Sequence, residues 1–97
     1  MIRHCVLLKF LPETSDQERE RAIEGIRGLP EHIPEIAEYT MGFDADLRDG
    51  NFDLAVVGDF NSSEDYLVYA SHPKHLEVIS NHLAPFLADR SAVQYYL

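Results

Sequence analysis

The segment that decides the fold of this chain is Ile2-Arg3-His4-Cys5-Val6-Leu7-Leu8-Lys9-Phe10. Its residues favour a β-strand, and alternate side chains of a strand point to opposite faces of a sheet. One face carries the even-numbered residues, Ile2, His4, Val6, Leu8 and Phe10, and the other carries Cys5 and Leu7 flanked by Arg3 and Lys9. Because both faces are largely apolar, we expect both sides of this strand to be covered.

The residues that follow predict three helices and three further strands. Ser15 and Glu18 have the spacing of a capping box, and apolar residues then recur at helical spacing until about Gly28. Asp49-Gly50-Asn51 is a hairpin-type turn between two β-rich stretches. The remaining elements are expected as strands at 36–43, 52–60 and 91–97 and as helices that begin at Ser62 or Ser63 and at Pro73 and run to about Ala70 and Leu83.

This order, β-α-β-β-α-α-β, predicts a ferredoxin-like α+β sandwich with helices on one face of a four-stranded antiparallel sheet. The open face would carry Cys5, Leu7, Ala55 and Val57, and would be an exposed apolar patch in a monomer. We therefore expect a homodimer in which two open sheet faces pair, forming a dimeric α+β barrel. Residues 1–97 are expected to form a single domain, because the length is too short for two.

Composition excludes several classes of partner. Eight Lys and Arg residues stand against 17 Asp and Glu residues, a formal net charge of −9. Nucleic acid and anionic membranes are not expected as partners, because both are bound mainly through clustered basic residues. The N-terminal segment is too short for a signal peptide or a membrane span, and the lone Cys5 permits no internal disulfide, so we expect a soluble cytoplasmic protein.

Three pieces of the sequence together resemble a known family. The strand at 2–10, the stretch at 52–57 and the string Tyr69-Ala70-Ser71-His72-Pro73-Lys74-His75 resemble the stress-response A/B barrel (Dabb) family over nearly the whole chain. The resemblance implies a homodimeric barrel, in a family that includes the plant polyketide cyclase olivetolic acid cyclase. In the cyclase branch, the residues matching Tyr69 and His75 hold a substrate carbonyl and exchange protons during an aldol-type ring closure that needs no cofactor.

The chemistry of these residue types agrees with that implication. A histidine can take or give a proton near neutral pH, and a phenol can donate a hydrogen bond to a carbonyl or an enolate. Tyr69 and His75 flank the turn at Pro73 and can converge, and His4 would point to the same side of the sheet. Further ligand-binding candidates are His72 and the apolar wall residues Val6, Leu8, Leu54 and Val56.

These observations leave three functions open. The leading hypothesis is binding of a small apolar or aromatic molecule in a pocket between the sheet and the helices. The enzyme alternative is a cofactor-independent cyclase, lyase or isomerase acting on a carbonyl compound, with His75 as base, Tyr69 as donor and His4 as a positioning group. The third is a structural stress protein without a ligand.

Each candidate site residue also has a purely structural interpretation. Tyr69 can be a half-buried core aromatic, His72 a helix cap, and His75 with His4 a polar pair that joins helix to strand. Gln94 stands near a position where relatives often carry an Asp that could orient the histidine. No metal is expected, because the histidines lack companion carboxylate or cysteine ligands at suitable spacing.

Overall fold

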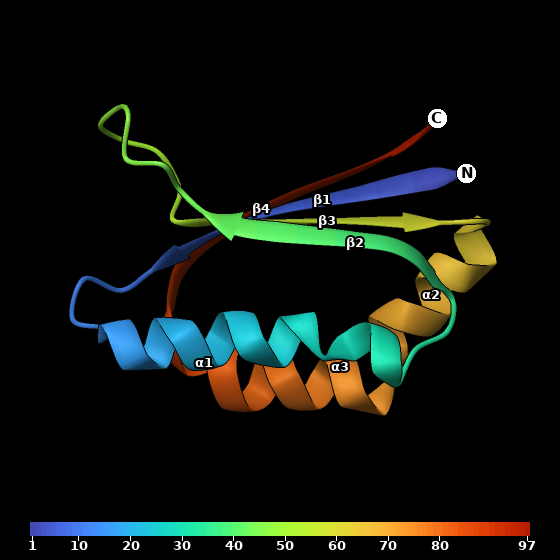
Figure 1. Ribbon diagram of the computed structural model, residues 1–97, viewed down its shortest axis with the longest axis horizontal. Helices are drawn as coiled ribbons and strands as arrows, with labels where there is room; N and C mark the ends of the chain where they lie inside the picture. The colour runs from blue at the N-terminus through green and yellow to red at the C-terminus, as the bar shows by residue number, and fades with distance from the viewer.

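The computed structural model covers residues 1–97 and places a four-stranded sheet against one layer of helices (Figure 1). The sheet is antiparallel throughout, with the strand order β2-β3-β1-β4. The elements are strands β1 (Ile2–Phe10), β2 (Ile36–Phe43), β3 (Leu54–Phe60) and β4 (Leu87–Tyr96) and helices α1 (Asp16–Arg27), α2 (Ser63–Ser71) and α3 (Pro73–Val78). Short helical turns follow α1 at Leu29–Glu31 and extend α3 through Ile79–Leu83 and Ala84–Phe86. The predicted ferredoxin-like α+β sandwich is confirmed.

Helix α1 begins and packs as its sequence predicts. The backbone N–H of Glu18 donates to Ser15 Oγ at 3.1 Å, and the backbone N–H of Ser15 donates to Glu18 Oε1 at 2.9 Å, which completes the capping box. The buried side of the helix then packs against the sheet. Together with Leu83, which follows α3, they form a core whose other members are Val6, Leu8, Phe10, Ala22, Ile23, Ile26, Leu54 and Val56.

Two strands begin at other residues than the sequence pattern indicates. β3 begins at Leu54 rather than Phe52, because the carboxylate of Asp53, and not a backbone carbonyl, accepts from Phe10 N at 2.8 Å, and the ladder with β1 ends at Leu54. β4 begins at Leu87, four residues before the expected start at Ser91. It pairs with β1 along its whole length, with a register shift between Lys9 and Phe10.

The two faces of β1 differ sharply in burial. All five even-numbered side chains, which face the helices, are buried. On the opposite face, Leu7 is 42% exposed, Val93 of β4 is 57% exposed and Tyr95 is 44% exposed. Figure 1 shows that every helix lies on one side of the sheet, so a single chain leaves the other side open.

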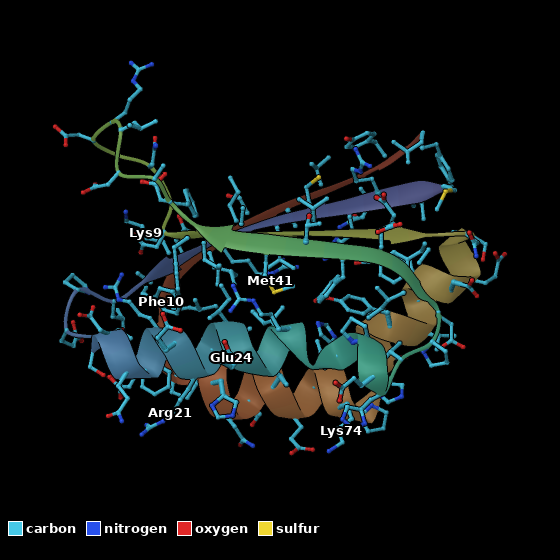
Figure 2. All side chains as sticks on the ribbon, in the orientation of Figure 1. Lys9, Phe10, Arg21, Glu24, Met41 and Lys74 are labelled. Carbon is cyan, nitrogen blue, oxygen red and sulfur yellow. The ribbon has the colours of Figure 1, made fainter.

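Side-chain directions follow the same division. Figure 2 shows Phe10 and Met41 between the sheet and the helices, whereas Arg21 and Lys74 lie on the side of the helices away from the sheet. No helix combines the length and the apolar character that crossing a membrane requires.

Candidate functional site

A cavity of about 240 Å³ lies between the sheet and the helices. Thirteen of its 16 lining residues are hydrophobic, and its polar groups are histidine rings, tyrosine hydroxyls and one guanidinium. The lining residues are His4, Val6, Leu8, Ile26, Leu29, Tyr39, Val56, Tyr66, Tyr69, Ala70, His75, Val78, Ile79, Leu83, Leu87 and Arg90.

Tyr69 lies buried at the last turn of α2, in contact with both strand and helix residues. Its ring stacks on His75 with 4.3 Å between ring centroids and a tilt of 31°. Its hydroxyl lies 2.9 Å from the hydroxyl of Tyr39 on β2. Burial raises the pKa of both phenols, so both keep their protons at neutral pH. One hydroxyl of the pair donates to the other, which leaves the second O–H proton free for a ligand.

His75 stands in the first turns of α3, and its ring orientation is fixed by the backbone. Nδ1 lies 3.0 Å from the carbonyl oxygen of Ala70. Because a carbonyl only accepts, Nδ1 carries the proton and Nε2 of the neutral ring offers a lone pair. Burial lowers the pKa of His75 below its ordinary value, so the ring is neutral at neutral pH. This is the protonation state that a general base or a hydrogen-bond acceptor requires.

His4 is buried in the row of apolar side chains on β1. The side-chain N–H of Gln94 on β4 donates to Nδ1 of His4 at 2.8 Å, which leaves the ring proton on Nε2. The His4 ring lies 5.0 Å from the Tyr66 ring and 5.9 Å from the Tyr69 ring, centroid to centroid. Burial, with help from the charge of Arg90 and the neighbouring His75, lowers the pKa of His4 to about 4.

The three predicted catalytic residues therefore meet at one cavity, but not as the predicted polar pair. His4 and His75 make no hydrogen bond to each other, and each uses Nδ1 for a partner of its own. Neither Nε2 makes a hydrogen bond within the chain. Because every fully buried side-chain nitrogen and oxygen has a hydrogen-bond partner, neither Nε2 atom is fully buried. Both Nε2 atoms are thus accessible to a molecule that enters the cavity.

The remaining candidates divide into wall residues and structural residues. Val6, Leu8 and Val56 line the cavity, as expected. Leu54 does not line it, because α1 and the neighbouring strands enclose this side chain in the core. His72 also lies outside it and caps α3 instead, its Nδ1 accepting from the backbone N–H of Lys74 at 3.1 Å.

In relatives, an Asp near the position of Gln94 was expected to orient the histidine; here two different groups orient the two histidines. Gln94 orients His4 rather than His75, because the register of β1 and β4 places it directly opposite His4. The carbonyl of Ala70 orients His75 instead. The lack of a carboxylate at position 94 therefore leaves neither ring without an orienting partner.

Three polar residues that line the cavity were not predicted from the sequence. Tyr66 lies three residues before Tyr69 on the same side of α2, a helical spacing that could have identified it. Tyr39 lies on the helix-facing side of β2 with Met41, so alternation within that strand contained the signal. Arg90 lies before the strand start expected from the sequence, so no sequence pattern predicted that it stands opposite Leu8. No cluster of three or more His, Cys, Asp or Glu side chains gathers in a way that could hold a metal ion.

Comparison with known proteins places these features in context. The family model for the stress responsive A/B barrel domain matches residues 2–97. A dimeric ferredoxin-like protein of unknown function from Thermobifida fusca is 38% identical, with a TM-score of 0.91 over 99% of this chain and 90% of that one. A dimeric protein of unknown function with a ferredoxin-like fold from Bacteroides fragilis is 25% identical, with a TM-score of 0.86 over 99% and 95%.

A hydroxynitrile lyase from Passiflora edulis shares the fold, with 23% identity and a TM-score of 0.87 over 99% of this chain and 92% of that one. No curated protein matches the sequence significantly.

The lowered pKa values of His4 and His75 predict that acid destabilises the fold. An unfolded histidine takes up its proton near pH 6.5, whereas His4 in the folded protein does so only at about pH 4. The unfolded chain therefore binds more protons between these values, and the free energy of unfolding should fall as the pH is lowered from about 6.5 to about 4. His4 should account for on the order of 2–3 kcal/mol of that loss.

Urea unfolding at a series of pH values measures the slope, and NMR of the histidine rings measures the midpoint of His4 directly. The variant His4→Gln should show a shallower slope than wild type, because it lacks this titrating group. A His4 midpoint of 6 or higher would contradict the burial argument.

Proposed function

The chain belongs to the stress responsive A/B barrel domain family, and from this premise we propose that it binds a small apolar or aromatic molecule in the cavity between its sheet and helices. The observation that carries the proposal is a hydrophobic cavity into which a few oriented polar groups converge. Its volume of about 240 Å³ lies just below the roughly 300–1,000 Å³ of ordinary ligand sites. The ligand is therefore small.

The polar groups define how such a ligand is held. His75 Nε2 is an acceptor, His4 Nε2–H is a donor, and the Tyr39–Tyr69 hydroxyl pair retains one free O–H proton. All of these groups are uncharged at neutral pH, because burial disfavours their charged forms. An aromatic ring bearing a hydroxyl or a carbonyl matches this combination of neutral donors, a neutral acceptor and apolar walls.

Binding of 4-propylphenol, a neutral aromatic probe, tests this proposal. We expect the probe to shift the NMR signals of the Val6, Leu8 and Val56 methyl groups and of the His75 ring. The variant His75→Phe keeps an aromatic ring but loses the acceptor nitrogen, so it should weaken binding by several-fold to tenfold, the effect of one lost hydrogen bond.

The matched control is His32→Phe, an equivalent change at an exposed histidine, which should leave the affinity unchanged. Saturating probe that shifts none of the cavity signals would count against ligand binding and would favour a purely structural protein.

A cofactor-independent cyclase, lyase or isomerase is the second candidate function. The observation that favours it is the stacking of the His75 ring, held with Nε2 unprotonated, on the ring of Tyr69. In this reaction Nε2 of His75 takes a proton from a carbon next to a carbonyl, and the electron pair of the broken C–H bond forms an enolate. The Tyr69 hydroxyl donates a hydrogen bond to the enolate oxygen, and His4 positions the substrate.

Deuterium exchange isolates this first proton transfer. Phenylacetone in D₂O should lose its benzylic C–H signal faster with the protein than with buffer alone. We expect His75→Ala to lower the catalysed rate by about 10²- to 10⁴-fold, the usual contribution of a general base. Tyr69→Phe should lower it less, and His32→Ala should not change it. Probe binding without any exchange above buffer would eliminate the catalytic candidate and leave the binding function intact.

We also propose that the chain acts as a homodimer paired through the open face of its sheet, forming a dimeric α+β barrel. The exposed side chains of Leu7, Val93 and Tyr95 lie on this face. One pair of opposite charges on this face is already neutralised, since Arg3 donates to Asp59 through Nε at 2.7 Å and Nη2 at 2.9 Å. The Thermobifida fusca and Bacteroides fragilis relatives, which are dimers, support this assembly.

An acidic residue in the middle of the open face should separate the dimer. Val93 lies opposite Cys5 on that face, and Val93→Asp would bury an unpaired carboxylate in the interface, weakening association at least 100-fold. Static light scattering at micromolar concentration should give a dimer for wild type and a monomer for this variant. Leu76→Asp, at a half-exposed leucine of α3, is the control and should stay dimeric. A monomeric wild-type protein would refute the assembly.

A further inference from the structure

Arg90 is an uncompensated cation at the rim of the cavity. It stands on β4 directly opposite Leu8, lines the cavity and remains exposed. No carboxylate lies within ion-pair distance of its guanidinium, which also makes no hydrogen bond. Arg3, Arg19 and Arg27 each pair with an acidic side chain. Arg21 and Arg48 are unpaired as well, but neither lines the cavity. An unpaired cavity cation is notable in a chain whose net charge is −9.

The charge of Arg90 reaches the polar end of the same cavity. It contributes to lowering the pKa of His4 and of His75, which burial lowers first. It shares the helix-facing side of the sheet with Leu8, so it does not lie on the open face through which we propose that two chains pair. One small molecule lying along β1 could therefore contact Arg90 and the two histidines together.

We propose that Arg90 binds the carboxylate of a small aromatic acid whose ring fills the cavity. The proposal rests on the ligand-binding function proposed above and specifies its ligand class. A planar guanidinium matches a carboxylate with two parallel N–H donors, which makes arginine well suited to this anion. The rim position also fits the energetics, because the carboxylate stays partly hydrated while the ring is buried, and burying the anion in the apolar interior would be costly.

A matched pair of probes, 4-propylbenzoate and its neutral amide 4-propylbenzamide, tests the assignment by calorimetric titration at pH 7. Wild type should bind the carboxylate at least tenfold more tightly than the amide. Arg90→Gln should abolish that preference and leave the amide affinity within twofold of wild type, which also shows that the cavity is intact. Arg90→Lys keeps the charge but loses the planar guanidinium with its two parallel N–H donors, so it should retain part of the preference for the carboxylate.

The control is Arg21→Gln on α1, an arginine that points away from the sheet in Figure 2 and should keep the full preference. Equal binding of the two probes by wild type would overturn the role of Arg90 but leave the cavity as a binding site for neutral aromatics. A preference for the carboxylate that persists in Arg90→Gln would likewise overturn the role proposed for Arg90. Failure of both probes to bind would instead overturn the binding function on which the inference rests.

Discussion

The hydrogen bond between His4 and Gln94 resolves a conflict built into the central strand. The alternation of β1 assigns position 4 to the buried row of Ile2, Val6, Leu8 and Phe10, where an unsatisfied polar ring would destabilise the fold. The neighbouring edge strand supplies a partner, because its register brings Gln94 opposite His4. One ring nitrogen is thereby satisfied by the protein, and the other is left to the cavity. The core and the candidate site consequently share one row of side chains, because Val6 and Leu8 belong to both.

Burial determines what this site can do chemically. It keeps the histidines and tyrosines neutral, which suits hydrogen bonding to a polar aromatic molecule. The same burial lowers the basicity of His75, so a proton taken by Nε2 would be held less tightly than by an exposed histidine. The Ala70 carbonyl partly offsets this loss of basicity. It accepts a hydrogen bond from Nδ1–H, and that hydrogen bond becomes stronger when the ring is charged. This balance makes binding the simpler function and proton transfer the more demanding one.

Local patterns of the sequence predict most of the fold, and non-local pairings account for what they miss. Alternation in β1 and the capping box at Ser15 involve neighbouring residues, so both are readable without a structure. Tyr69 and His75 are likewise close in sequence, and a single turn brings them together. Arg90 and Gln94 depend instead on the register of β4, whose polar start at an exposed sheet edge conceals the strand pattern. The hydrogen-bond partner of His4 could not be predicted for the same reason.

Strand β4 links the two proposals about assembly and ligand binding. It is an edge strand paired only with β1, and nearly all of its side chains are exposed in the single chain. Val93 and Tyr95 belong to the open face, whereas Arg90 and Gln94 alternate onto the side of the cavity. Covering the open face with a second chain would hold β4 against β1 and so restrict the motion of both cavity residues. Dimerisation would then organise a site that contains no residue of the interface itself, because opposite faces of one strand serve the two purposes.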